Sequence, residues 1–310
     1  MCACARPRVI IAYRFAKGEE LRYKMTMRGS GTTSTAGLPG QRSGAETPVK
    51  LQVELVYRMV VKDSDDRGNA DIETHFESFI STTESGTLKI RMEADEKGAR
   101  IIQGETVVKD APGLEGLKAL FGSPTMVKMD KRGSVRSITH PKGIVELLPH
   151  VNIYNLLKQN QFILPEGPIA IGHSWNEKRD IALGGGLEER LPGAKALKLD
   201  TKYTLAGLVR RNGRSCADIT LRGEVAAKDL IMDLPQGQGA EMAMKAAFDR
   251  LRQTTVGNIY FDPQKGLMVG MHVDTDQDMA MTMKMAKGET ETKFSTATKI
   301  KIESDLKLLE

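Results

Sequence analysis

The chain is poor in cysteine, in tryptophan and in long apolar runs. It has 3 cysteines and 1 tryptophan in 310 residues, and so small and odd a set of cysteines does not predict a disulfide framework. No run of about 18 apolar residues occurs, so the sequence predicts no membrane-spanning helix. Residues 1–8 lack the apolar centre of a signal peptide, and we expect them to form a disordered tail.

Motifs of catalysis are also missing. The 5 histidines stand singly, without the paired spacing of a zinc site, and no glycine-rich phosphate loop occurs. The segment Gly172-His173-Ser174 begins like a nucleophile elbow but is not followed by the final glycine. We therefore expect no enzyme, no catalytic residues and no cofactor. The net charge is only +5, with no concentrated basic face, so we expect no nucleic-acid partner.

Alternation of apolar and polar residues dominates what is present. Leu21, Tyr23, Met25 and Met27 alternate with polar residues, and residues 51–61 follow the same period. A period of two with one wet face is typical of antiparallel sheets. The sequence predicts a mainly β protein with a few helices: a duplicated antiparallel β-meander that forms a curved sheet or half-barrel, with helices on its concave side.

Three segments favour helices and one favours a loop. Residues 114–121, 141–159 and 240–252 place apolar side chains at helical spacing, and Phe248 lies on the apolar face of the third. Residues 29–48 are rich in Gly, Ser, Thr and Pro. This composition predicts a long flexible loop between two strands.

The two halves of the chain resemble each other. Residues 56–78 and 201–224 share a tyrosine, a turn with glycine and an Ala-Asp-Ile triplet. Residues 127–138 and 259–271 share the order strand, Asp, turn with glycine, strand. We expect residues 9–310 to form a single domain of two pseudo-repeats with a helical, proline-rich crossover between them, divided as 9–140, 141–168 and 169–310.

Three segments also resemble a known family. They are YRFAKGEELRYKM at 13–25, ILPEGPIAIGHSW at 163–175 and FDPQKG at 261–266. Together they resemble an uncharacterised bacterial envelope family of lipoprotein-type domains, which has a KGE opening hairpin and an LPxxP…GxxW segment between two β halves. In folding style this family is similar to the LolA/LolB-like lipoprotein carriers, whose curved sheet wraps around helices over an apolar cavity.

The resemblance implies an exported protein of the periplasm or cell envelope, and no catalytic residues are carried over from the family. We also expect peripheral contact with the membrane as a partner. The missing leader favours the alternative, a cytoplasmic protein. Within the central segment, Gly172 permits a tight turn before a strand that starts at Trp175. We expect the ring of Trp175 to point inward as a core anchor.

Methionine is common, with 16 Met against 8 Phe. In an alternating strand, Met279, Met281 and Met283 share one face and line an apolar space with Leu21, Met25 or the helix that carries Phe248. Flexible methionines suit plain core packing, an adaptable apolar cavity or, through their thioethers, Cu(I). The candidate residues for an apolar ligand are Met25, Met27, Phe248, Met279, Met281 and Met283.

The opposite face of that strand carries His272, Asp274, Asp276 and Asp278. Oxygen ligands at this spacing can attract a hard cation, but the run lacks the glycine and the bidentate glutamate of a calcium loop. The simpler interpretation is a solvated acidic face that pairs with lysines of the last strand. These four residues are weak metal candidates, and we expect no metal.

These features predict a non-enzymatic binding protein that shelters an apolar small molecule or lipid in the cell envelope. The alternative is a structural or interaction protein whose concave face is filled by its own side chains. An empty apolar cavity in the structure would discriminate between the two.

Overall fold

The computed structural model describes residues 8–37, 44–108, 114–139, 162–181, 197–228, 230–234, 242–287 and 290–309. These residues form antiparallel strands and one short helix, which confirms the predicted fold class. In chain order the elements are β1 (Arg8–Val9), β2 (Glu20–Ala36), β3 (Glu46–Ser64), β4 (Ala70–Ser85), β5 (Leu88–Asp95), β6 (Gly98–Gln103), β7 (Thr106–Val108), α1 (Leu114–Gly122), β8 (Thr125–Met129), β9 (Val135–Thr139), β10 (Ile169–Ala170), β11 (Ser174–Ile181), β12 (Leu197–Arg211), β13 (Arg214–Ala227), β14 (Leu230–Leu234), β15 (Met242–Asp262), β16 (Leu267–Lys287) and β17 (Thr290–Leu309).

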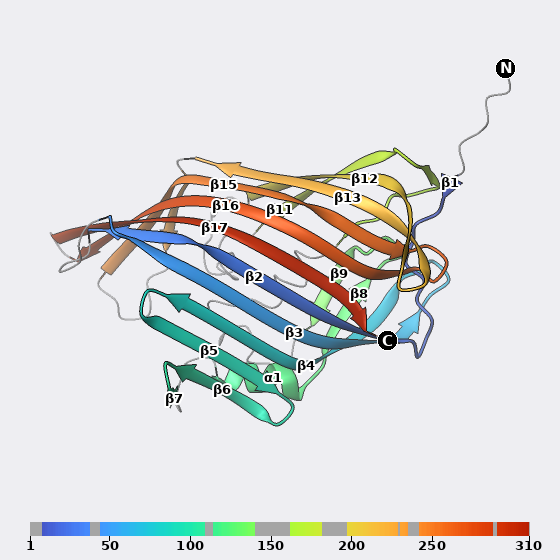
Figure 1. The fold of residues 1–310 in the computed structure, drawn as a ribbon, viewed down its shortest axis with the longest axis horizontal. Helices are drawn as coiled ribbons and strands as arrows, with labels where there is room; N and C mark the ends of the chain where they lie inside the picture. The colour runs from blue at the N-terminus through green and yellow to red at the C-terminus, as the bar shows by residue number, and fades with distance from the viewer. Residues whose placement is uncertain are drawn as a thin grey trace, which may run out of the picture.

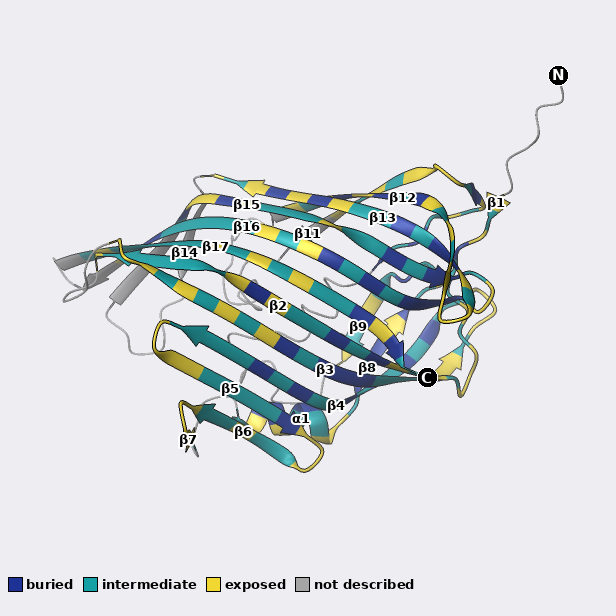
Figure 2. Ribbon diagram, in the orientation of Figure 1, coloured by how far each residue is buried: buried dark blue, intermediate teal, exposed yellow. Residues whose placement is uncertain are grey.

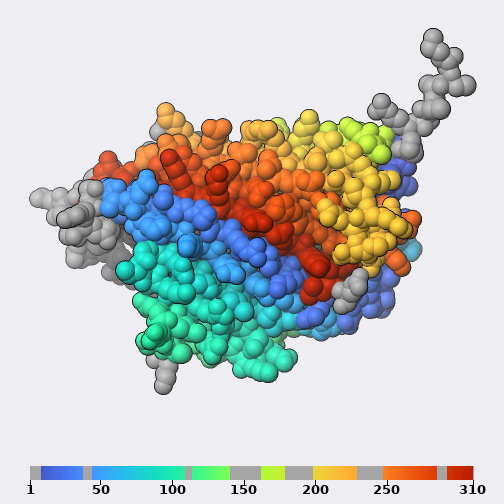
Figure 3. Space-filling model, in the orientation of Figure 1, coloured from blue at the N-terminus to red at the C-terminus, as the bar shows by residue number. Residues whose placement is uncertain are grey.

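Most strands belong to one open, curved sheet of 15 strands. Its order is β11-β12-β13-β15-β16-β17-β2-β3-β4-β5-β6-β7, with β14 beside β15 and the β8–β9 hairpin beside β4. The C-terminal β17 pairs with β2, from Ser295 opposite Ala36 to Leu309 opposite Arg22. Figures 1 and 3 show these strands as adjoining red and blue bands, so both halves of the chain share one sheet.

The inner face of the sheet, toward α1 and the β8–β9 hairpin, is apolar at one end, which we call the near end. A continuous row of buried cross-strand neighbours runs through it from β13 to β5: Ile219, Ile259, Met271, Leu306, Met25, Leu55, Phe79 and Ala94. In the next row the rings of Tyr23, Tyr57 and Phe76 pack in series. Strands from both halves of the chain therefore build one core cluster.

The same strands continue into the other end of the sheet, which we call the far end, where the side chains on the inner face are smaller and more polar. The row there is Ala227, Leu251, Met279, Thr298, Thr33 and Thr47. Of these six only Leu251 is buried. Figure 2 shows the buried bands gathered toward the end of the sheet that carries the C-terminus. Burial therefore decreases along the strands although the hydrogen-bonded pairing continues.

One predicted helix is confirmed and another is wrong. α1 covers the predicted residues 114–121, with Leu117 and Leu120 buried against the sheet. The described residues of the segment 240–252 instead begin β15, which pairs with β14 on one side and β16 on the other. A β-bulge between Phe248 and Arg250 inserts one extra residue into the strand. The apolar side chains on either side of the bulge are therefore three residues apart instead of two, and this spacing resembles that of a helix. The helix predicted at 141–159 lies outside the described residues.

The loop predicted at 29–48 is wrong for its described residues. β2 continues to Ala36 and β3 begins at Glu46, so much of this segment is strand. Position 31 of this strand is occupied by glycine because a Cβ atom there would collide with the carbonyl oxygen of Lys299 on β17. The threonines of the segment are β-branched and fit a pleated surface, which the composition alone did not reveal.

The segments that resemble each other in sequence form corresponding local structures. Residues 56–78 and 201–224 lie in the antiparallel pairs β3–β4 and β12–β13. The order of pairing also corresponds, since β3-β4-β8-β9 in the first half matches β12-β13-β15-β16 in the second. The division of a single domain into two pseudo-repeats stays a prediction.

Two further segments bear on the sequence predictions: the start of the described chain at Arg8 and the segment around Trp175 that follows the crossover. Arg8, which we expected in the tail, lies in β1 opposite Ala170, whereas residues 1–7 lie outside the described part. Trp175 follows the first residue of β11; its indole nitrogen donates to the carbonyl oxygen of Ile163 at 2.9 Å, and its ring stacks on Tyr203. No helix within the described residues is long and apolar enough to cross a membrane.

Candidate functional site

A partly enclosed apolar cavity of about 110 Å³ lies on the inner face at the near end of the sheet. One wall comes from the sheet and includes Leu21, Tyr23, Met25, Leu55, Tyr57 and Met59. The opposite wall comes from the N-terminal segment and the β8–β9 hairpin, and includes Tyr13, Phe15, Val127, Met129, Val135 and Ile138. The cavity therefore lies between the central strands of the sheet and a covering layer, which consists of the N-terminal segment and the β8–β9 hairpin that branches from β4.

Methionine and tyrosine give this cavity its character. Its methionines are Met25, Met59, Met129, Met268 and Met271. Their unbranched side chains adopt many shapes at small energetic cost, so a cavity lined by them can adapt to different apolar guests. The described lining residues include no His, Cys, Asp or Glu, so they offer no nucleophile paired with a base.

The predicted apolar-ligand residues do not lie together. Met25 lines the cavity, together with Leu21, as we expected, and Met27 packs beside it against the same core cluster. Met279, Met281 and Met283 share the inner face but lie half-buried toward the far end. They are not among the residues that line this cavity, and their role in holding an apolar ligand stays a prediction.

Phe248 lies at the far end in β15. Its ring is buried, and the residue stands opposite Met281 on β16. Nearby, Met279 packs against Val225 and Leu251 in a small separate cluster. Met279 therefore takes part in local packing. The register of β16 places Met279, Met281 and Met283 on one face of the sheet, as the alternation of the sequence predicted.

Sequence reasoning missed most of the wall that covers the cavity. Met59 could have been predicted to line the inner face, because it alternates with polar residues in β3. Tyr13, Phe15 and Met129 gave no such signal, since they reach the cavity only through contacts between segments far apart in the chain. One glycine-containing turn in each half of the chain fixes the N-terminal segment over the cavity.

These two turns clamp the N-terminal segment. The amide of Tyr13 donates to the carbonyl oxygen of Lys131 at 2.8 Å, and the amide of Arg14 donates to that of Gly266 at 3.0 Å. Gly133 and Gly266 both have positive φ, and a Cβ atom on Gly266 would come within 2.5 Å of the Arg14 nitrogen. The turns belong to the two similar sequence segments, so both halves of the chain help to close the cavity.

The tyrosine hydroxyls form the polar part of the cavity. The Tyr23 hydroxyl donates to the carbonyl oxygen of Met268 at 3.0 Å. Burial raises the pKa of Tyr13, Tyr23 and Tyr57. For Tyr23, electrostatic interactions with Tyr13 and Tyr57 raise the pKa further, so these tyrosines stay protonated.

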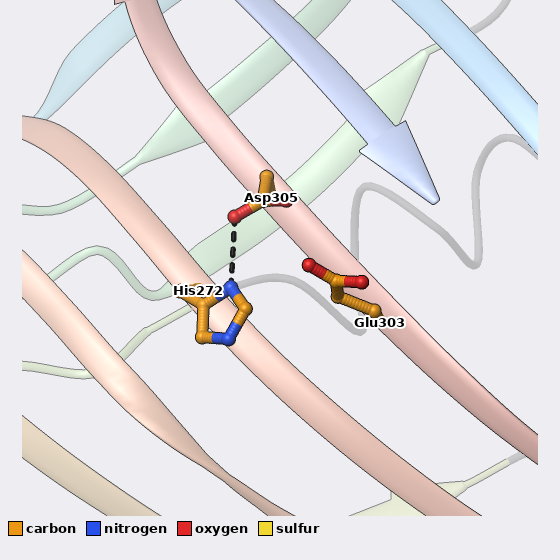
Figure 4. A group of neighbouring side chains, drawn as sticks. All are labelled: His272, Glu303 and Asp305. Carbon is orange, nitrogen blue, oxygen red and sulfur yellow. Dashed lines mark hydrogen bonds and ion pairs between the residues drawn. The ribbon is translucent and has the colours of Figure 1, made fainter. Parts of the chain in front are cut away.

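A second candidate lies on the outer face, on the neighbouring strands β16 and β17. His272 Nδ1 lies 2.8 Å from Asp305 Oδ1, and Glu303 is the next outward-facing residue along β17, as Figure 4 shows. His272 Nε2 lies 3.6 Å from Asp274 Oδ2. The hydrogen bond with Asp305 raises the pKa of His272, with Asp274 and Glu303 as further negative neighbours.

The four weak metal candidates are thus divided between this cluster and ordinary ion pairs. Asp276 lies 3.8 Å from the ammonium of Lys301, and Asp278 accepts from Arg250 at 2.8 Å. Of the predicted set only His272 belongs to the group of side chains that could hold a metal ion, together with Glu303 and Asp305 from the last strand, and Asp274 is an ion-pair neighbour of His272. These contacts fit the solvated, paired acidic face that we expected.

Comparison with known proteins gives no family for this chain. No protein-family model and no curated protein matches it. Among solved structures it is similar to lipovitellin, in a structure of its lipid–protein interactions, with 10% identity, a TM-score of 0.45 and coverage of 96% of this chain and 26% of that chain. The chain thus spans about a quarter of the length of that lipovitellin chain.

Two outer membrane channels are also similar. One is a channel from Pseudomonas putida F1, at 7% identity and a TM-score of 0.23, with 96% of this chain and 97% of that chain covered. The other is the channel DcaP of Acinetobacter baumannii, at 8% identity and a TM-score of 0.16, with 94% and 99% covered. All three TM-scores lie below 0.5, so these likenesses carry no argument about function.

Proposed function

We propose that this protein is a non-enzymatic binding protein that holds a small apolar molecule between the near end of its sheet and the covering layer. The cavity of about 110 Å³ carries this proposal. Its methionine-rich walls support it, because such walls adapt to a guest more readily than branched side chains do. The absence of acidic, histidine and cysteine side chains among its described lining residues supports the non-enzymatic part.

The size of the cavity limits its guest. An apolar cavity of about 150 Å³ engineered into another protein takes up benzene or xenon. The present cavity is smaller, so it suits xenon or a compact hydrocarbon, and a lipid chain enters only if methionines move. The location in the cell envelope that we propose for the protein rests on the sequence resemblance, and fractionation of cells that express the native gene would test it.

Xenon and benzene binding, followed by NMR of protein labelled with [methyl-¹³C]methionine, tests the proposal. We expect saturable shifts in the methyl signals of Met25, Met59 and Met271, which line the cavity. The signals of Met281 and Met283 at the far end serve as internal controls and should not move. Shifts that are absent, or equal at both ends of the sheet, would contradict specific binding.

A cavity-filling variant provides the matched control. Val135→Phe adds a ring to the half-buried wall of the β8–β9 hairpin, and it should abolish the xenon shifts while the far-end signals keep their positions. If the variant binds as well as the wild type, the guest lies elsewhere. The structural alternative, a core filled by its own side chains, would be favoured if neither the variant nor the wild type bound xenon.

A further inference from the structure

Apart from Arg14, the polar side chains in the described lining of the cavity are ones that carry hydroxyl groups. Tyr13, Tyr23, Tyr57 and Thr74 line it, and Tyr57 and Thr74 are 8% and 2% exposed. They come from the N-terminal segment and three different elements of the fold, β2, β3 and β4. None of these strands pairs with the segment that carries Tyr13, so the four residues line one cavity only because the N-terminal segment lies against the sheet.

Several of these hydroxyls have unused hydrogen-bonding capacity. Tyr23 donates to Met268, which leaves its oxygen free to accept. Among the hydrogen bonds between described residues, none involves the hydroxyl of Tyr13, Tyr57 or Thr74. A buried hydroxyl without a partner is unfavourable, and such groups at a cavity wall are the usual means of orienting a ligand in an otherwise apolar site.

The charge of the wall decides which polar group these hydroxyls fit. Tyrosines whose pKa is raised by burial remain neutral donors. Arg14 also lines the cavity, but the side chain is exposed and its guanidinium donates to the carbonyl oxygen of Gln264 at 3.1 Å. With no other cation in the described lining, a buried carboxylate would lack a counter-charge.

We propose that the cavity binds a compact neutral molecule with an apolar body and one hydrogen-bond-accepting oxygen, such as a ketone or an ether, with this oxygen against the hydroxyls of Tyr13 and Tyr57. This inference rests on the proposed function, since it names the ligand class of the same site. The apolar part of the ligand contacts the methionines, and the oxygen gives the ligand its orientation.

Two ligands of equal shape test the inference. Cyclohexanone and methylenecyclohexane differ in an oxygen against a CH₂ group, and titration of the full-length protein, followed by methionine methyl NMR, gives both affinities. Because the ketone loses more hydration than the alkene on burial, the two affinities are compared with the partition of each ligand from water into hexadecane. We expect the ketone to bind at least about 3–10-fold more tightly than this partition predicts, which corresponds to one hydrogen bond. Benzoate, which is similar in size but charged, should bind more weakly than the ketone at pH 7.

Removal of single hydroxyls then locates the contact. Tyr57→Phe and Tyr13→Phe should each reduce the preference for the ketone by about 3-fold or more and leave the affinity for methylenecyclohexane unchanged. Tyr260→Phe is the matched control, because that hydroxyl accepts from Arg211 on the outer face, away from the cavity. It should leave both affinities unchanged.

The outcomes separate the two proposals. If neither ligand binds, the proposed function fails, and buried water satisfies the hydroxyls. If both ligands bind only as their partition into hexadecane predicts, and Tyr57→Phe and Tyr13→Phe have no effect, apolar binding stands and the assignment of the oxygen is wrong. Tighter binding of benzoate than of cyclohexanone would overturn the neutral ligand class.

Discussion

The near and far ends of the sheet's inner face are built on the same strands but packed differently. At the near end, cross-strand neighbours such as Leu55 and Phe79 are each 1% exposed. At the far end the corresponding positions carry threonine and methionine, and hydroxyl pairs such as Thr33 with Thr298, 3.3 Å apart, replace apolar contacts. The antiparallel ladder is continuous through both ends.

This difference shows that alternation in the sequence reports the face on which a side chain lies but not how deeply that side chain is buried. A period of two fixes the face on which a side chain lies, because successive side chains point to opposite faces. It does not fix how deeply that face is buried, because depth depends on what packs against it. Met271 and Met281 have the same parity on β16, yet Met271 is buried and Met281 is half-buried.

Truncation of one phenylalanine at each end should give the largest contrast. Phe79→Ala removes a ring that is 1% exposed, and it should lower the free energy of unfolding by about 3–5 kcal/mol. Phe294→Ala removes a half-buried ring on β17 at the far end and should lower it by about 1–2 kcal/mol. Urea unfolding of both variants measures the difference. Equal losses would show that the far end is packed as tightly as the near end.

The turns at the two ends should respond differently to an added methyl group. Gly266→Ala at the near end places a Cβ atom 2.5 Å from the Arg14 nitrogen at a positive φ of 70°, so we expect a loss of about 2–4 kcal/mol. Gly44→Ala, in the far-end turn between β2 and β3, meets strain at φ 83° but no atom within 4 Å, and should lose about 1 kcal/mol. Thermal melts compare the two, and a similar loss in both would mean that the contact with Arg14 contributes nothing.

A smaller effect is expected at the far-end methionines. Met281→Ala truncates a half-buried side chain opposite Phe248, so it should lower the free energy of unfolding by about 1 kcal/mol, below the 2–5 kcal/mol of a fully packed methionine. Because Met281 does not line the cavity, xenon binding should be the same as in the wild type. A loss of xenon binding in this variant would show that the far end belongs to the ligand site.

The sequence predicted the architecture well because antiparallel strands leave a local signal. The alternation of Leu21, Tyr23 and Met25, and the glycine turns between strands, were sufficient for the fold class and for the inner face. The segments at 29–48 and 240–252 failed for the opposite reason. There the local composition and spacing favoured a loop and a helix, and neighbouring strands on both sides imposed a strand instead.

The cavity could be predicted only in part. Alternation placed Met25 on the inner face, and it lines the cavity. Tyr13 and Met129 form the opposite wall through contacts with strands far away in sequence, and no local pattern encodes such contacts. The same holds for His272, whose partner Asp305 lies 33 residues later on the neighbouring strand; the sequence pointed to Asp274, Asp276 and Asp278 because they were close in the chain.

The smallest expected effect concerns the outer face behind the near end, where His272 faces Asp274, Glu303 and Asp305. The Asp305 hydrogen bond raises the pKa of His272 above its ordinary 6.5 in the folded state. Protonated His272 therefore stabilises the fold fully below pH 6.5, and this contribution is lost as the pH rises through the higher folded pKa. The side chain is 44% exposed, so the contribution should be at most about 1 kcal/mol. Asp305→Asn should shift the histidine pKa back toward its ordinary value in NMR titrations and should reduce the loss of stability as the pH rises above 6.5. Asp276→Asn, which removes a partner of Lys301 on the same face, is the control and should leave the titration of His272 nearly unchanged. If both variants shift the pKa equally, the general negative charge of the outer face, and not the contact with Asp305, sets the pKa of His272.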